Sequence, residues 1–305
     1  MSNRLLTEEL GSRWRADGWC VIKGAFSGVE LTRAQEAVGS LFPTADEMDS
    51  GVDDERTAPW RTGDAHWPEF PFDNGALNHL VVHEALIDMA EDLLETDDVR
   101  LYQGTLTAKY SNQSSGYNRL LHTDYPNHSI VVPRLDAGYQ QLETYIYLSD
   151  VSTANGATRM VSRRLTTDIP VERHSLRLDD YDYLYDEPGE AAGPAGSVVA
   201  YRPDVYHRSV DRTEPGVSRF MLHVAYKAAG AEWAGYQAWP FKGFTPAWHN
   251  FVQGASVRQL TVTGFPKPGH SYWTEETLAG VHARYPRLDL EPWRAAFDSG
   301  RSGAT

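Results

Sequence analysis

From Val99 onward, apolar residues recur with a period of two, and Gly- and Pro-rich turns separate the short segments that carry this pattern. The pattern runs over 99–109 and 141–148, as expected for β-strands whose two faces meet different surroundings. Two further apolar runs, over 196–201 and 217–227, each follow a turn. Short strands at this density predict a mainly β fold with flanking helices, either a sandwich or a jelly roll.

The first 95 residues predict helices around one short strand. Leu10 and Trp14 recur at helical spacing, and Gly18 ends the pattern before an apolar strand over 19–22. Ser27 and Glu30 have the spacing of a capping box that opens a second helix.

Three more segments complete the expected elements. The segment 46–74 is rich in Asp, Pro and Trp, and it is long enough to be an active-site cover rather than a plain connection. A third helix is expected over about 77–94, and a last one near 288–297.

These patterns predict one domain over 1–305. It has a helical part over 1–95, a β core over about 99–230 and an aromatic-rich C-terminal extension over 231–305. A core or subunit-contact role is expected for the aromatic residues of the extension. The domain is expected to be a monomer or a homodimer.

Charge and composition exclude several classes of protein. The chain has 28 basic and 42 acidic residues, a net charge of −14, which disfavours nucleic-acid binding. It lacks the long apolar run of a membrane span and the apolar stretch of a signal peptide. One cysteine, Cys20, fits a reducing compartment. We therefore expect a cytoplasmic protein that binds neither membranes nor nucleic acid.

His122 and Asp124 are the residues that point most directly to chemistry. This is the one place in the chain where an acidic residue stands two positions after a histidine. In a β-strand such residues point to the same face. A second histidine from a neighbouring strand would complete a 2-His-1-carboxylate site, which suits Fe(II) and leaves coordination positions open. His207, just after the run 198–201, is the candidate.

Arg219 and Ser209 suggest an anion beside this metal. Ser209 stands two residues after His207, and Arg219 lies on the next strand beyond a turn at Pro215. A hairpin there would bring the two strands into adjacent register. An arginine can bind a carboxylate through two hydrogen bonds, and a hydroxyl adds a third. Lys109 and Arg212 are the alternatives for this role.

With these residues in view, the chain resembles the phytanoyl-CoA dioxygenase family of Fe(II)/2-oxoglutarate oxygenases. The resemblance covers roughly 5–230. It rests on a helix followed by the Asp-Gly and apolar strand of 17–26, on His122-Thr-Asp124, on a strand that ends in an Asn155-Gly156 turn, and on His207, Ser209 and Arg219. The chain departs from the family at 161–164, where Val-Ser-Arg-Arg replaces the usual Pro-Gly-Ser-His.

The resemblance implies a mainly β fold with flanking helices and a double-stranded β-helix core, of the jelly-roll or cupin-like kind, together with a set of roles and a reaction. His122, Asp124 and His207 would bind Fe(II), and Arg219 with Ser209 would hold the distal carboxylate of 2-oxoglutarate. Gln103 and Thr105 lie where the family often places further cosubstrate contacts. The implied reaction consumes O2 and 2-oxoglutarate, releases succinate and CO2, and hydroxylates a C–H bond, with desaturation or ring formation as other outcomes.

The substrate is expected to be a small or medium-sized metabolite. A net charge of −14 with one Arg-rich segment speaks against an acyl-CoA. Trp67, in the long segment 46–74, is expected to contact an apolar part of the substrate. Arg163, in the Arg-rich stretch 159–177, is expected to face any acidic group.

Three other functions stay open from the residues alone. A cupin-type metal dioxygenase or isomerase could use the same three ligands without 2-oxoglutarate, although Arg219 and Ser209 argue against it. A non-catalytic jelly-roll binding protein would be expected to lack one of the ligands. A zinc hydrolase would need a third histidine or a general base.

Overall fold

Two five-stranded antiparallel sheets form the core of the computed structural model, which describes residues 4–110, 120–128, 141–170, 172–186, 189–210, 216–231 and 245–302. The strands of the first sheet are, in spatial order, β1 (Trp19–Ile22), β8 (Val198–Tyr201), β4 (Gln141–Tyr147), β10 (Ser218–Ala228) and β2 (Val99–Tyr110). Those of the second are β6 (Ser175–Leu176), β3 (Leu121–His122), β9 (His207–Arg208), β5 (Thr158–Met160) and β7 (Gly189–Ala191). The arrangement confirms the predicted jelly roll.

Alternation along the strands of the first sheet gives it two different faces. On β10, Leu222 and Val224 belong to the hydrophobic cluster shared with the helices. Met221, one residue earlier, belongs to a second cluster with Tyr147 and Tyr201, on the other face. Because strand residues two apart share a face, every second residue of β2, β4 and β10 points into the jelly roll. These inner positions supply the polar groups described below.

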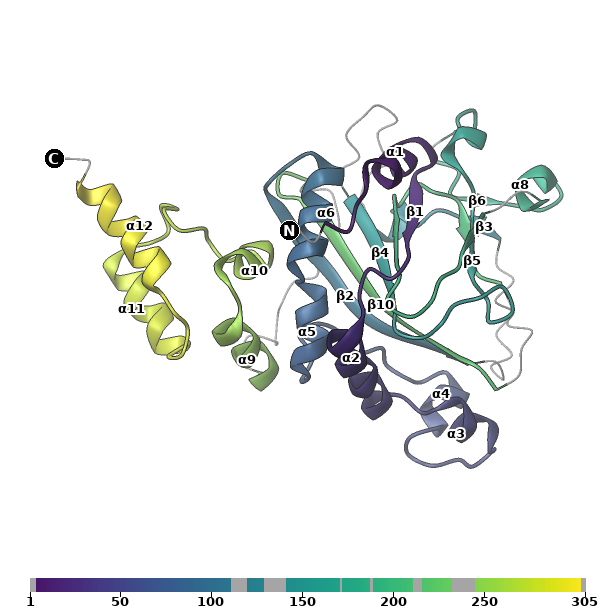
Figure 1. Ribbon diagram of the computed structural model, residues 1–305, viewed down its shortest axis with the longest axis horizontal. Helices are drawn as coiled ribbons and strands as arrows, with labels where there is room; N and C mark the ends of the chain where they lie inside the picture. The colour runs from purple at the N-terminus through teal and green to yellow at the C-terminus, as the bar shows by residue number, and fades with distance from the viewer. Residues whose placement is uncertain are drawn as a thin grey trace.

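Helices cover the outer face of the first sheet (Figure 1). They are α1 (Glu8–Asp17), α2 (Gly28–Leu41), α5 (Gly75–Val81) and α6 (Glu84–Leu94). The single helix expected over 77–94 is two helices, because the His83 side chain caps α6 by accepting a hydrogen bond from Ala85 N–H. The capping box expected at Ser27 is wrong, since that side chain makes no capping hydrogen bond.

The segment 46–74 is more ordered than its composition predicts. It contains the helix α4 (Ala58–Thr62) and most of α3 (Ala45–Asp49), and a real capping box at Thr44 and Glu47 opens α3. Its later part lies along the free edge of β2, where the amide of Phe70 donates to the carbonyl of Gly104. Phe70 is fully buried. Much of this segment therefore packs against the core instead of forming an open cover.

The C-terminal helices lie beyond α5 and α6, at the end of the molecule away from the second sheet (Figure 1). They are α9 (Pro246–Gly254), α10 (Val257–Val262), α11 (Glu275–Arg284) and α12 (Glu291–Ser302). The last helix thus begins three residues later than expected. Phe251 packs edge-on against Phe70 at 4.8 Å, and Trp248 donates to the hydroxyl of Tyr285, which confirms a packing role for these two aromatic residues. The other expected aromatic positions, over 232–244, lie outside the described residues.

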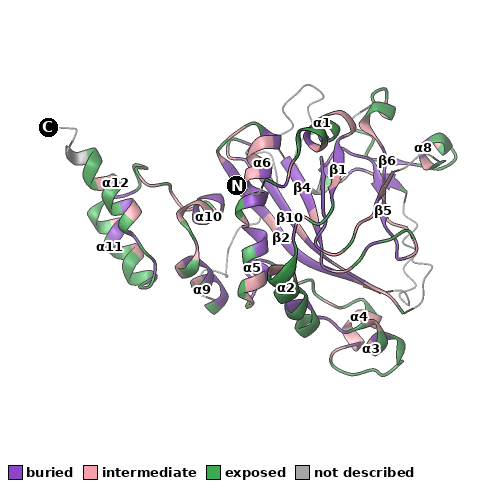
Figure 2. Cartoon of the chain, viewed as in Figure 1, coloured by how far each residue is buried: buried purple, intermediate pink, exposed green. Residues whose placement is uncertain are grey.

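Burial follows this layering: the strands are largely buried, whereas α11 and α12 expose most of their surface (Figure 2). The remaining short elements, α7 (Tyr125–His128), η1 (Arg163–Leu165) and α8 (Asp182–Asp186), lie in connections around the second sheet. None of the helices in the described ranges has both the length and the apolar character that a membrane crossing requires.

Candidate metal centre

His122, Asp124 and His207 meet at the inner side of the second sheet. β3 and β9 pair so that His122 stands directly opposite His207. Asp124 lies in the bend after β3, and its amide donates to the carbonyl of Pro203. One donor atom from each residue lies within 4.8 Å of the others, with Nε2 of His207 3.3 Å and Nε2 of His122 3.9 Å from the carboxylate. The sequence pair therefore converges as expected, through a bend instead of a long strand.

The hydrogen bonds of the two imidazoles leave the correct nitrogen available for a metal. Nδ1 of His122 lies 2.9 Å from the carbonyl oxygen of Leu120, and Nδ1 of His207 lies 3.1 Å from that of Val205. A carbonyl oxygen can only accept, so each Nδ1 carries the hydrogen. Each neutral ring then presents the Nε2 lone pair toward Asp124. Metal-binding histidines are usually oriented in this way by their second nitrogen.

Asp124 is held as a carboxylate. Burial acts to raise its pKa, but the imidazoles of His207, His128 and His122 and a hydrogen bond from Tyr201 outweigh burial and lower it. The Tyr201 hydroxyl donates to Oδ2 over 2.8 Å. Two imidazole nitrogens and one ionised carboxylate are the donor set of facial Fe(II) sites. The chain therefore offers ligands that fit this metal.

A second group of possible ligands, Glu30, His79 and His83, lies on the helical side of the molecule. Here the hydrogen bonding is reversed, because Nδ1 of His83 accepts from the amide of Ala85. The hydrogen of neutral His83 is then on Nε2, which lies 3.1 Å from Glu30. This arrangement suits a hydrogen bond to the carboxylate and leaves no lone pair on Nε2 for a metal.

Arg219 is buried on the inner face of β10, with 2% of its surface exposed. Its guanidinium donates to the carbonyl of Gly156, and Asn155 supports that turn through hydrogen bonds to Asp150 and Ser152. The expected hairpin between the strands of His207 and Arg219 is wrong. β9 and β10 belong to different sheets, because β9 pairs with β3 and β5 while β10 lies between β4 and β2.

Lys109 connects these two sheets. It stands opposite Arg219 in the pairing of β2 with β10, and its Nζ lies 3.1 Å from Oγ of Ser209. Two cationic side chains and a hydroxyl thus gather near the strand of His207. Arg212, the other alternative from the sequence, lies outside the described residues.

Gln103 and Thr105 share the inner face of β2 with Lys109 but lie toward its other end. Thr105 stands opposite His223, and Nε2 of Gln103 is 3.4 Å from Nδ1 of that histidine. At about 3.3 Å per residue, Gln103 is about 20 Å along the strand from Lys109. A cosubstrate role for these two residues stays a prediction.

Sequence reasoning missed a buried polar cluster at this end, formed by Glu143, His223, Tyr102 and His128. Glu143 is fully buried and interacts with the other three side chains. Burial raises the pKa of Glu143 and lowers that of His128 to about 4. The spacing in the sequence could have placed His223 on the inner face, because His223 stands four residues after Arg219 on the same strand.

The two residues expected to contact substrate lie in different surroundings. Trp67 is 51% exposed, two residues before the bridge between Glu69 and Thr105 on β2. Arg163 forms an ion pair with Asp204 at 3.0 Å, a carboxylate that also binds Arg202. Arg159 and Arg164 are likewise paired with Glu190 and Asp17. Both substrate roles stay predictions, and these ion pairs weaken the one for Arg163.

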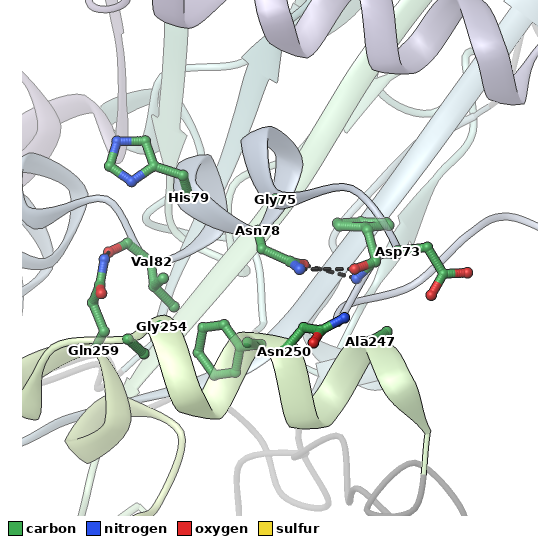
Figure 3. Close-up of a pocket in the computed structure, with 12 residues that line it drawn as sticks. Asp73, Gly75, Asn78, His79, Val82, Ala247, Asn250, Gly254 and Gln259 are labelled. Atoms are coloured by element: carbon green, nitrogen blue, oxygen red, sulfur yellow. Dashed lines mark hydrogen bonds between the residues drawn. The ribbon is translucent and has the colours of Figure 1, made fainter. Parts of the chain in front are cut away.

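A cavity of about 280 Å³ lies between α5 and α9, on the outer side of the first sheet. Asn78 and His79 of α5 face Ala247 and Asn250 of α9 across it (Figure 3). Asn78 is fully engaged in two hydrogen bonds of 2.7 Å with the backbone of Phe72. The cavity is separate from the three metal-ligand candidates and shares no residue with them.

Comparisons with known proteins show the family and the fold of this chain. The family model described as phytanoyl-CoA dioxygenase matches residues 14–220. No curated protein matches the chain. Among solved structures, the chain is similar to the non-heme α-ketoglutarate-dependent carbocyclase SnoK from nogalamycin biosynthesis, with 22% identity, a TM-score of 0.55, and coverage of 76% of this chain and 87% of that one.

Two further structures show the same fold. One is EctD from S. alaskensis, with 18% identity, a TM-score of 0.54, and coverage of 78% of this chain and 84% of that one. The other is HygX from Streptomyces hygroscopicus with nickel and 2-oxoglutarate bound, with 16% identity, a TM-score of 0.52, and coverage of 74% and 88%.

Proposed function

This chain belongs to the phytanoyl-CoA dioxygenase family, and we propose that it oxidises an unactivated C–H bond of a small or medium-sized metabolite at the jelly-roll metal centre. The family uses Fe(II) and 2-oxoglutarate, so the chain is an enzyme of the Fe(II)/2-oxoglutarate oxygenase type. Its reaction involves O2 and a small-molecule substrate. Hydroxylation is the outcome that we propose.

The hydrogen bonding of His122 and His207 carries the proposal. Both rings donate Nδ1–H to a backbone carbonyl and so direct Nε2 toward Asp124. We assign the metal ligands to these three residues. When bound, iron and 2-oxoglutarate supply the oxidising chemistry, in which O2 is consumed and succinate and CO2 are released. The protein contributes orientation and the anchoring of the cosubstrate.

We assign that anchoring to Arg219 and Ser209, with Lys109 as a third contact. All three lie near the strand of His207, where two cationic side chains and a hydroxyl gather. Such a group can bind a carboxylate of 2-oxoglutarate through charge-assisted hydrogen bonds. Tyr147 lies on the neighbouring strand β4, close enough for Arg219 to act on the pKa of its hydroxyl. The aromatic ring of Tyr147 would form an apolar wall of the site.

Succinate formation from 2-oxoglutarate, with Fe(II) added and a panel of candidate metabolites, tests the proposal. Arg219→Ala should weaken 2-oxoglutarate binding by about 10- to 150-fold, because a charge-assisted hydrogen bond contributes about 1.5–3 kcal/mol. Arg219→Lys should restore only part of the affinity. A parent enzyme that oxidises a substrate without 2-oxoglutarate would identify it instead as a cupin-type dioxygenase.

A further inference from the structure

The inner face of the first sheet carries two cationic side chains at one end and a buried carboxylate toward the other, where Lys227 of β10 donates to the carbonyl of Ala231. Lys109 and Arg219 face each other at one end. Glu143 of β4 stands beside Ala225, six residues farther along β10, which is about 20 Å at about 3.3 Å per residue. An anion such as 2-oxoglutarate fits the cationic end. A ligand at the Glu143 end would meet different groups.

Glu143 is surrounded by hydrogen-bond donors of the protein. It is fully buried, and it accepts from the hydroxyl of Tyr102. Its second oxygen lies 2.8 Å from Nε2 of His223, and Nδ1 of His128 lies 3.4 Å from its first. These neighbours shield the carboxylate, so a ligand would meet His223, which keeps 13% of its side chain exposed.

The neighbours of His223 determine which nitrogen faces a ligand. The amide nitrogen of Gln103, 3.4 Å from Nδ1, can only donate. Nδ1 therefore accepts, and Nε2–H donates to Glu143. A buried carboxylate behind an imidazole fixes the ring and increases the basicity of its other nitrogen. His223 thus has one acceptor, Nδ1, which Gln103 holds over a long 3.4 Å, and the donor of a ligand would take the place of the Gln103 amide there.

This acceptor is adjacent to the metal centre. The ring of Tyr145 packs against His223 at 4.8 Å between centroids. The hydroxyl of Tyr145 lies 2.7 Å from that of Tyr201, which in turn donates to Asp124. A molecule bound at His223 would therefore lie one aromatic layer from the proposed metal ligand.

We infer that the substrate presents a hydrogen-bond-donating group, a hydroxyl or a protonated amine, to His223 backed by Glu143. This inference rests on the proposed function, because it assigns the cationic end to 2-oxoglutarate. Gln103 and Thr105 then contact the substrate rather than the cosubstrate. The aromatic rings of Tyr145 and Tyr201 would hold the apolar body of the same molecule, and a cationic group would gain from those rings as well.

Three small probes of similar shape test the inference: benzylamine, benzyl alcohol and benzoate. The full-length protein is loaded with Mn(II) and 2-oxoglutarate, and line broadening of each probe in proton NMR spectra reports binding close to the metal. A Zn(II)-loaded sample gives the diamagnetic reference. Benzylamine, benzyl alcohol or both should be broadened at least about fivefold more than benzoate, and the one that prevails identifies the donor.

Two variants with a matched control connect this preference to the residues. Glu143→Gln and His223→Asn should each reduce donor-probe binding about tenfold, the effect of about 1.4 kcal/mol. Both should retain Mn(II) and 2-oxoglutarate affinity. His79→Asn, on the outer side of the molecule, should change nothing. If circular dichroism shows that Glu143→Gln is unfolded, the binding of the donor probes to His223→Asn tests the inference.

The possible failures are distinguishable. Equal broadening of the three probes, no broadening of any of them, or donor binding that survives His223→Asn would overturn the inference while metal and 2-oxoglutarate binding remain. A parent protein that binds neither Mn(II) nor 2-oxoglutarate would overturn the proposed function, and the inference with it.

Discussion

The hydroxyl of Tyr201 donates a 2.8 Å hydrogen bond to Oδ2 of Asp124, the same oxygen that lies 3.3 Å from Nε2 of His207. Tyr201→Phe removes this donor and keeps the ring. We expect Fe(II) affinity to fall about 10- to 100-fold, as is usual when a group that orients a ligand is lost. Anaerobic Fe(II) titration measures it. Tyr147→Phe, a buried hydroxyl bonded to a backbone carbonyl, is the control and should bind Fe(II) like the parent.

The two candidate ligand clusters can be separated by metal stoichiometry. Asp124→Ala should abolish high-affinity Fe(II) binding and succinate formation, because the carboxylate is the one anionic ligand of the set. His79→Ala, in the outer cluster with Glu30, should retain one Fe(II) per chain and full activity. Retention of iron by the Asp124 variant, or its loss from the His79 variant, would move the metal centre to the outer cluster.

Lys109 and Gln103 allow the cosubstrate position to be located along β2. Lys109→Met keeps most of the unbranched side chain and removes its charge, so 2-oxoglutarate affinity should fall about 10-fold or more. Gln103→Leu should leave that affinity close to the parent value. Calorimetric titration of the Zn(II)-loaded proteins provides both measurements. A larger loss for Gln103→Leu than for Lys109→Met would place 2-oxoglutarate at the opposite end.

The stability of the metal-free protein should decrease below neutral pH. Burial lowers the pKa of His128 from 6.5 to about 4, so between these values the unfolded chain binds a proton that the folded chain does not. The free energy of unfolding should therefore fall with decreasing pH, by up to about 1.4 kcal/mol per unit from this group. Urea unfolding at pH 7 and pH 5 measures the change. The free energy of unfolding of His128→Asn should decrease less between pH 7 and pH 5. An equal decrease in the variant and the parent would exclude His128 as the cause.

Gly18 couples the N-terminal helix to the loop that precedes His207. It has a left-handed backbone (φ 82°), and a Cβ there would lie 2.5 Å from a methyl of Val205 and 2.6 Å from Arg163. Gly18→Ala should cost about 1–3 kcal/mol of stability. Because the carbonyl of Val205 orients His207, Fe(II) affinity should fall as well. Gly24 also has a left-handed backbone, but no atom lies near a Cβ added there. Gly24→Ala is therefore the control, and it should leave Fe(II) affinity unchanged.

The strands and the three ligand candidates could be predicted from the sequence because their signals are local. A period of two marks a strand with two different faces, and the spacing of His122 and Asp124 brings two ligands together. The break at His83 could not be predicted in this way. Its cause is one side chain that caps a helix, inside an apolar pattern that continues through the break.

Other features depend on pairing between distant strands. The placement of β9 and β10 in different sheets, and the alignment of Lys109 with Arg219, follow from register. A one-residue change of register would turn every side chain to the opposite face, and no local pattern specifies which distant strand is the partner. Glu143 and His223 were missed for this reason, since they are 80 residues apart in the chain.

The sequence by itself determined the class of fold, the helical N-terminal part and the residue types of the metal centre, because periodicity, capping and short spacings act within a few residues. Only the tertiary structure decided that Lys109 and Arg219 gather at one end of the jelly-roll interior and that Glu143 lies toward the other. That division arises when β2, β4 and β10 are aligned side by side and alternate residues of all three point inward. The charges of the strands then add on one face, and burial strengthens their effect on any ligand that enters.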